Sequence, residues 1–330
     1  MKKNVWVNML LWGTAFPDLD AVARIFDIIK AAGGSGAECP VGFDSPLEHY
    51  GRIGVLAKEC GLGMSAVGLA SSDATVTSPI EAVREAGVTN LELLVGRTEA
   101  LDAVGVGGPL ILPWKHRPVD EDGKELTGAA LVDELLFRLN LSLPYIRRVA
   151  EYAEKKRRFI YGEHLKGWEV AFLNLIGQMV NYVREADRSR LGVLDDTSHE
   201  TSDGHGLDAY RSAVGELHAH KIPRWRHVSA TGQRGTVSKT WIPFKLFFGI
   251  DKGLGVTESE PAVLEIFDAR PPFADCVCIN RREFSDIPAL LKSEIGFVQD
   301  EWEKAPVIHP NSNVKVTYEV TPFSGAPDSD

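Results

Sequence analysis

The feature that most constrains the fold is a repeated unit, in which a short apolar run is followed by a segment with helical periodicity. Glycines such as Gly33 and Gly61 end several of the expected helices. The expected strands lie at residues 4–10, 36–39, 64–69, 110–112, 158–161, 191–194, 214–217 and 262–264. This alternation predicts an α/β (β/α)₈ TIM barrel over residues 1–304, with residues 305–330 as a C-terminal extension.

The alternative α/β architecture is a doubly wound open sheet. A Gly-rich phosphate-binding fingerprint typically follows the first strand of such a sheet, and none is present after residues 4–10. The glycine-rich residues 104–108 come before an expected strand, so we expect them to form a turn. The sequence also lacks the G-x-S-x-G elbow of serine hydrolases. These absences favour the closed barrel.

Composition excludes several functional classes. The net charge is −10, and no basic stripe with interleaved aromatic residues occurs, which argues against nucleic-acid binding. The four cysteines have no disulfide-framework spacing, which is typical of a reducing cytoplasm. No apolar run is long enough to cross a membrane, and the N-terminal run is interpreted as the first strand, not as a secretion signal. We therefore expect a cytoplasmic protein.

Four expected strands in series end in potential metal ligands. The residues are Glu163, Asp196, His220 and Glu265. In a parallel barrel these ends share one face, where active sites are built. Each residue taken alone is more often a surface charge or a satisfied histidine. The series favours a site for one divalent ion, and its mixed oxygen and nitrogen ligands suit Mn²⁺, Mg²⁺ or Co²⁺.

Such a site suits proton transfer next to a ketone. Glu163 and Glu265 would face each other across the metal, each with an oxygen free to take a proton. His199 and Arg226 follow Asp196 and His220 closely enough to bind substrate oxygens. Aromatic side chains just after strand ends are candidates to stack on a sugar, although rim packing explains them equally well: Trp12, Trp114 and Phe267.

As a spaced set, these motifs resemble the xylose-isomerase-like barrel superfamily, and within it the ketose 3-epimerases. The matching residues are Glu163 with Glu169 six positions later, Asp196-Thr197-Ser198-His199, His218-Ala219-His220 with Arg226, and Glu265-Ile266-Phe267. The resemblance covers residues 4–302. It implies that Glu163, Asp196, His220 and Glu265 bind one metal ion, with Mn²⁺ as the first expectation. It also implies that Glu163 and Glu265 act as acid and base, and that Glu169 contacts the substrate.

Three departures from the epimerase pattern resemble the catalytic α subunit of bacterial C-glycoside deglycosidases. These are His164 directly after Glu163, the longer segment 221–239, and the C-terminal tail. That resemblance implies cleavage of 3-oxo-C-glucosides, with His164 as acid/base beside the aglycone, and assembly with a small β subunit. The interpretation places this lyase ahead of the ketose 3-epimerase, and a non-catalytic sugar-binding or assembly subunit last. We expect an oligomer, with segment 221–239 or the tail contacting another chain.

Overall fold

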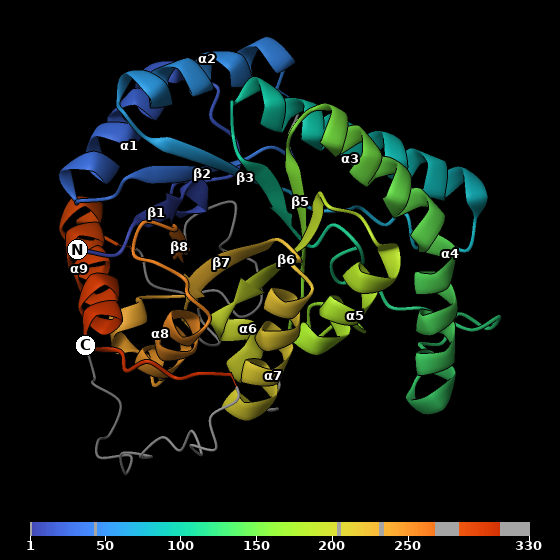
Figure 1. Ribbon diagram of the computed structural model, residues 1–330. Helices are drawn as coiled ribbons and strands as arrows, with labels where there is room; N and C mark the ends of the chain where they lie inside the picture. The colour runs from blue at the N-terminus through green and yellow to red at the C-terminus, as the bar shows by residue number, and fades with distance from the viewer. Residues whose placement is uncertain (1, 43–44, 203–205, 231–233, 268–283, 311–330) are drawn as a thin grey trace.

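Eight parallel strands close into a barrel surrounded by helices (Figure 1). The computed structural model describes all residues except 1, 43–44, 203–205, 231–233, 268–283 and 311–330. Each strand pairs with its sequence neighbours, and β8 closes the barrel against β1. The strands are β1 (Val5–Asn8), β2 (Gly36–Pro40), β3 (Gly63–Val67), β4 (Gly105–Gly108), β5 (Phe159–Glu163), β6 (Leu191–Asp196), β7 (Arg224–Ser229) and β8 (Ala262–Glu265). The predicted TIM barrel is confirmed.

The helices surround the strands, and the longer ones bury apolar side chains against them. In α1, Val22, Phe26 and Ile29 are fully buried, and the Asp18 side chain caps the first turn by accepting from the Asp20 backbone N–H. The helices are α1 (Leu19–Ala31), α2 (Leu47–Glu59), α3 (Glu81–Ala100), α4 (Gly128–Lys155), α5 (Ile176–Ala186), α6 (Thr197–Ser202), α7 (Gly206–Ala219), α8 (Phe244–Gly253) and α9 (Ile287–Lys304), with 3₁₀ turns η1 (Met9–Leu11) and η2 (Val237–Lys239).

A layer of large side chains fills the barrel interior. Trp6 and Trp225 meet edge to face with ring centroids 5.3 Å apart, and Tyr161 stacks on Trp225 at 5.9 Å. Leu194 and Val263 complete this buried cluster. The interior at this level is therefore packed and apolar, and it forms a floor beneath whatever lies at the C-terminal ends of the strands.

Glycines on neighbouring strands make room for this aromatic layer. A Cβ atom added at Gly36 or at Gly63 would lie 2.4 Å from the Trp6 ring, and one at Gly105 would lie 2.8 Å from the Tyr161 ring. The expectation that residues 104–108 form a turn is therefore wrong. They form β4, and the expected strand at 110–112 lies just beyond it. Glycines are favoured at Gly105 and Gly107 because side chains of nearby strands fill the space beside them.

The assignment of the seventh strand also needs correction. Residues 214–217 belong to α7, and β7 lies at Arg224–Ser229. Arg224 and Arg226 made this run appear too polar for a strand. Their side chains form buried ion pairs with Asp195 and Asp251 instead. Residues 224–229 of segment 221–239 therefore supply a strand of the barrel.

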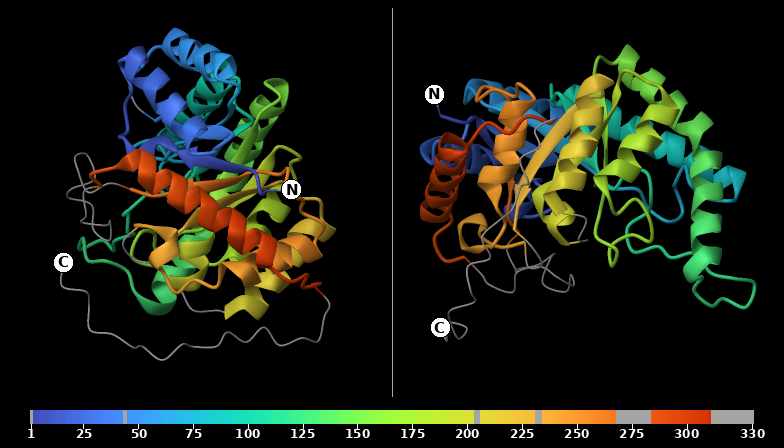
Figure 2. Two further views of the ribbon diagram at one scale, coloured as in Figure 1. Left: turned by 90° about the vertical axis from the view of Figure 1, so that its left-hand side faces the viewer. Right: turned by 60° about the horizontal axis from the view of Figure 1, so that its bottom comes forward.

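Two long helices and the chain terminus complete the architecture. Helix α4 contains Pro144 and is bent, and its N-terminal half extends away from the barrel (Figures 1 and 2). Helix α9 ends at Lys304, and the following residues return to α8, where the Ile308 N–H donates to the Gly249 carbonyl at 2.9 Å. Most of the expected extension, 311–330, lies outside the described residues. None of the described helices is long and apolar enough to span a membrane.

Candidate metal centre

A polar layer lies directly above the aromatic layer because side chains two apart on a strand share a face. On five strands the residue two positions after a floor residue is polar: Asn8 follows Trp6, Glu163 follows Tyr161, Asp196 follows Leu194, His227 follows Trp225, and Glu265 follows Val263. All five polar side chains are buried. The strand register thus collects three carboxylates and an imidazole at the C-terminal end of the barrel.

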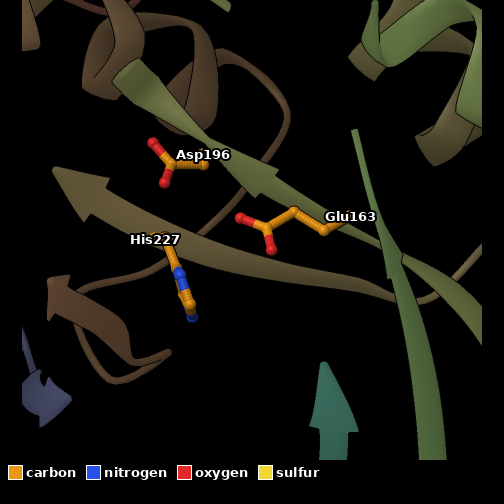
Figure 3. Close-up of side chains that lie close together, drawn as sticks. All are labelled: Glu163, Asp196 and His227. Atoms are coloured by element: carbon orange, nitrogen blue, oxygen red, sulfur yellow. The ribbon is translucent and has the colours of Figure 1, made fainter. Parts of the chain in front are cut away.

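Three of these residues form a compact ligand group. Glu163 on β5, Asp196 on β6 and His227 on β7 each offer one ligand atom, and these atoms lie within 4.8 Å of one another. Figure 3 shows the three side chains projecting into the same space from adjacent strands. Their spacing is suited to a single ion, with two carboxylate oxygens and one ring nitrogen.

Glu265 on β8 lies next to this group. Its Oε1 is 3.4 Å from His227 Nδ1 and accepts a hydrogen bond from Asn8 Nδ2 at 3.2 Å. Arg234 links Glu265 to Asp196, since its Nη1 donates to Glu265 Oε2 and, at 2.8 Å, to Asp196 Oδ2. Arg234 therefore reaches into the site from the segment after β7.

His199 lies between Glu163 and Glu169, the two glutamates that the sequence motif places six positions apart. Its Nε2 lies 3.1 Å from Glu163 Oε1, and its Nδ1 lies 3.4 Å from Glu169 Oε2. Arg234 Nη2 is 2.8 Å from His199 Nε2. The predicted residues Glu163, Glu169, Asp196, His199 and Glu265 are thus brought together at one site.

The concentration of carboxylates changes the ionisation of the site. Burial, and then the charge of Glu265, raises the pKa of Glu163 well above its ordinary value. Burial alone would also raise the pKa of Asp196, but the charges of His199 and Arg234 hold it well below its ordinary value. The pKa values of Glu163 and Asp196 are thus shifted in opposite directions, and a cation bound to both would favour the ionised form of each.

The donor set fits a hard or borderline divalent cation. Oxygen ligands dominate, one imidazole is present, and no described thiol lies in the ligand group, which matches Mn²⁺, Mg²⁺ or Co²⁺ better than soft metals. Three buried carboxylates close together also require compensating positive charge, to which Arg234 contributes and a bound ion would add. Glu163, Asp196, His227 and Glu265 are the residues that would hold the ion.

Two predicted site residues lie elsewhere. His220 follows the end of α7 and is exposed on the outside of the barrel, because residues 214–217 are helical. His227 on β7 takes the place expected for it. Arg226 points away from the site, since alternate residues of β7 face opposite sides. Arg226 Nη2 donates to Asp251 at 2.9 Å. The arginine that lies next to the metal group is Arg234 instead.

His164 is fully buried beside α6. Its Nε2 lies 3.6 Å from Glu200 Oε2, and its ring meets that of His199 edge to face, with centroids 6.0 Å apart. Glu200 is itself buried on α6. This environment separates the His164 imidazole from solvent, and its proposed contact with an aglycone stays a prediction.

The three predicted aromatic residues all follow the C-terminal ends of strands. Phe267 comes two residues after Glu265, and its ring centroid is 5.5 Å from the Arg234 guanidinium carbon. Trp12 follows η1 after β1, and Trp114 lies in the β4–α4 connection with the Lys115 ammonium 4.4 Å from its ring centroid. All three are half-buried. Their contacts with a sugar stay predictions.

Sequence reasoning missed four residues of the site: Asn8, Glu38, His227 and Arg234. The signal for His227 is the alternation Trp225-x-His227, which repeats Leu194-x-Asp196 on β6. Glu38 lies in the middle of β2, and a single carboxylate in so short a run resembles an ordinary loop charge in the sequence. Arg234 follows β7 by a few residues, so its assignment depended on identifying that strand correctly.

Comparison with known proteins places the fold. No protein-family model matches the chain, and no curated protein matches it. A crystal structure of a candidate sugar phosphate isomerase/epimerase from Anabaena variabilis matches with TM-score 0.84 and 22% identity, over 92% of this chain and all of that one. D-allulose 3-epimerase from Methylomonas sp., solved with D-allulose, matches with TM-score 0.74 and 20% identity, over 91% and 98% of the two chains.

A third solved structure has a different named activity on the same fold. The 3-keto-D-glucoside 4-epimerase of E. coli matches with TM-score 0.64 and 14% identity, over 91% of this chain and 99% of that one. At these identities the comparisons establish the fold, which is that of the sugar isomerase and epimerase barrels expected from the sequence motifs. Activity has to be argued from the site.

Proposed function

We propose that the protein is a divalent-metal-dependent sugar epimerase that moves a proton next to a ketone. The observation that carries this proposal is the ligand group of Glu163, Asp196 and His227 with Glu265 beside it. Proteins of the same fold include enzymes named for epimerising free ketoses and 3-keto-glucosides. The proposed substrate class is therefore a ketose or a keto-glycoside, and the proposed ion is Mn²⁺, with Mg²⁺ or Co²⁺ as substitutes.

When bound, the ion would supply positive charge beside the substrate carbonyl, which acidifies the adjacent C–H bond. Glu163 takes the proton from this carbon, and the electron pair of the broken C–H bond moves into the carbonyl to give an enediolate. Glu265, which lies on β8 beyond β6 and β7 and starts protonated, gives its proton to the opposite face of the carbon, and exchange with solvent then returns both carboxyl groups to their starting forms. The two carboxylates thereby invert one centre without net change in atoms or electrons.

Other residues bind and orient the sugar. His199, held between Glu163 and Glu169, presents a ring edge to the site, and Arg234 offers a guanidinium beside Asp196 and Glu265. Hydroxyl and enediolate oxygens are the groups that such donors recognise. The floor of Trp6, Tyr161 and Trp225 closes the barrel below and limits water entry from that side.

The structure gives no reason to favour the C-glycoside lyase hypothesis over the epimerase hypothesis. Cleavage of a C-glycoside needs an acid beside the aglycone, and His164 was the candidate. Its complete burial against Glu200 lends no support to that role. Deglycosidase activity, a small β subunit and a non-catalytic sugar-binding role are retained as outcomes to be tested.

The test uses the purified protein stripped of metal with EDTA and then supplied with Mn²⁺. D-allulose, D-tagatose, a 3-keto-glucoside and a 3-oxo-C-glucoside are offered separately, and products are followed by NMR. We expect a new epimer from at least one of the first three, only with metal, and none from Glu163→Gln. Release of an aglycone without epimer formation would replace the proposal by the lyase. No metal binding and no turnover would favour a sugar-binding module.

A further inference from the structure

A fully buried carboxylate, Glu38 on β2, lies next to His227 of the metal group. Its Oε2 is 2.8 Å from His227 Nε2, and both side chains are completely inaccessible to solvent. Glu38 is on the opposite side of the imidazole from the ligand group, because the other ring nitrogen, Nδ1, faces Glu265. The histidine is thus held between two carboxylates, Glu38 at Nε2 and Glu265 at Nδ1.

The remaining partners of Glu38 are all donors. Asn8 Nδ2 donates to Oε2 at 2.8 Å, while Ser65 Oγ and Trp225 Nε1 each donate to Oε1 at 3.1 Å. An indole N–H can only donate, and the Asn8 carbonyl oxygen already accepts from the Leu10 N–H at 2.9 Å, which fixes the orientation of that amide. This cage, formed by Asn8, Ser65 and Trp225, therefore accommodates an acceptor-only carboxylate, whose Oε2 also lies 2.8 Å from His227 Nε2.

We propose that Glu38 is the positioning residue of the metal centre: it accepts the Nε2–H of His227 and so leaves Nδ1 free as the metal ligand. The inference rests on the metal-dependent function proposed above. An imidazole that donates one ring N–H to a carboxylate is fixed in tautomer and in ring orientation, and it is a better ligand through the other nitrogen. Glu38 contacts neither substrate nor reacting atoms in this scheme.

The same cage extends to the second candidate acid/base. Asn8 Nδ2 donates both to Glu38 Oε2 and to Glu265 Oε1, so one amide connects the positioning carboxylate with Glu265. The strand register places Asn8 directly opposite Glu38, and Glu38 opposite Ser65. None of the candidate ligands lies on β1, β2 or β3. These strands instead carry Asn8, Glu38 and Ser65, and through Asn8 and Glu38 they contact two of the ligands, Glu265 and His227.

The informative variant is Glu38→Gln. The variant's amide has one oxygen and one NH₂ where Glu38 has two oxygens. The Trp225 indole N–H can only donate, so the amide oxygen faces Trp225 and the NH₂ faces Asn8 Nδ2 and His227 Nε2, of which only His227 Nε2 can accept. His227 then carries its proton on Nδ1 and loses the ligand lone pair. By isothermal titration with Mn²⁺ we expect affinity to fall roughly 10- to 100-fold. The matched control, Ser65→Ala, removes one donor to Glu38 but leaves the His227 contact, and its Mn²⁺ affinity should stay near that of the wild type.

A second readout separates positioning from general support of the fold. In the Zn²⁺-loaded wild-type protein, nitrogen NMR of the histidine ring should place the proton of His227 on Nε2 and the metal on Nδ1. If Glu38→Gln does not fold, Glu38→Asp retains the charge but cannot span the same distance, and it should also bind Mn²⁺ more weakly. Thermal unfolding of the metal-free variants checks that the barrel is intact.

Wild-type affinity in folded Glu38→Gln, equal weakening by Ser65→Ala, or a Zn²⁺–Nε2 bond would each overturn the inference. Failure of the wild-type protein to bind Mn²⁺ would overturn it as well. These measurements do not depend on turnover. Normal Mn²⁺ binding and the expected variant pattern, combined with no epimer formation, would count against the proposed reaction and leave the role of Glu38 standing.

Discussion

Asp196 on β6 and His227 on β7 are direct register partners, so the two strands present a carboxylate and an imidazole side by side at the same height of the barrel. Glu163 on β5 completes the group from the next strand. Because strand register fixes these positions, the site is a property of the barrel itself and not of its loops. The same register excludes His220, which lies outside the barrel on the end of α7.

The first prediction distinguishes the two histidines. His227→Asn should lose stoichiometric Mn²⁺, because it removes the nitrogen ligand, while His220→Asn should bind Mn²⁺ as the wild type does. Metal content after dialysis, measured by atomic emission, checks both variants. Metal loss on replacing His220, with retention on replacing His227, would restore the sequence-based assignment and contradict the register.

Arg226 should contribute to stability and not to substrate binding. Its guanidinium lies among Asp195, Asp251 and Tyr210 on the helix side of β7. Arg226→Met leaves these acidic side chains with less compensation, and we expect the free energy of unfolding to fall by roughly 3 kcal/mol. Urea denaturation measures the loss. A raised KM for the sugar with unchanged stability would show that Arg226 contacts substrate after all.

How far the sequence predicts this structure depends on what surrounds each strand. β5, β6 and β8 were predicted because each apolar run ends in a carboxylate. β4 was missed because Gly105 and Gly107 carry no side chains, and the space at Gly105 is filled by Tyr161 from β5. β7 was missed because Arg224 and Arg226 are compensated by acidic residues far away in the sequence. Such compensation is a tertiary effect that local pattern cannot reveal.

In the candidate site, too, some residues are predictable from local sequence and others only from tertiary contacts. Glu163, Glu169, Asp196, His199 and Glu265 were identified by spacing and resemblance, and they meet in space. Glu38 and Asn8 could not be identified from their own sequence context, because their importance arises from contact with His227 and Glu265. The chemistry of a ligand is visible in a motif, whereas the side chains that orient it become visible only when strands are paired.

A pH-dependent contribution to stability is expected from Lys3. Its ammonium is 3.9 Å from the Trp302 ring centroid and donates to the Thr257 carbonyl at 2.9 Å. Burial lowers the pKa of Lys3 from 10.5 to about 8. Between these values the unfolded chain binds more protons than the folded one, so stability rises with pH across this window. The gain from this residue is on the order of 3 kcal/mol.

Chemical denaturation at pH 7.5 and pH 10.5 measures this effect. The free energy of unfolding of Lys3→Met should rise less between these pH values than that of the wild type. Lys2→Met, at an exposed neighbouring position, should show the same rise as the wild type. An identical pH profile for wild type and Lys3→Met would show that Lys3 does not titrate on unfolding.

His164 separates the two enzymatic interpretations. His164→Ala should leave Mn²⁺ binding and proton exchange next to the ketone largely intact, since those steps belong to the metal ligands and glutamates. If the protein cleaves 3-oxo-C-glucosides, the same variant should lose aglycone release. Parallel loss of exchange and metal binding would make His164 a structural support for His199, with which its ring is in edge contact.

The central claim is that Glu163 and Glu265 exchange a proton with the substrate from opposite sides of a metal-bound sugar. Incorporation of deuterium from D₂O into the carbon next to the ketone, followed by NMR in the Mn²⁺-loaded protein, tests it most directly. For each epimer used as substrate, the account predicts exchange in the wild type and a fall of about 10²- to 10⁴-fold in one variant, Glu163→Gln for the epimer whose proton Glu163 removes and Glu265→Gln for the other, measured at metal saturation. Exchange at the wild-type rate in both variants with bound metal would contradict it.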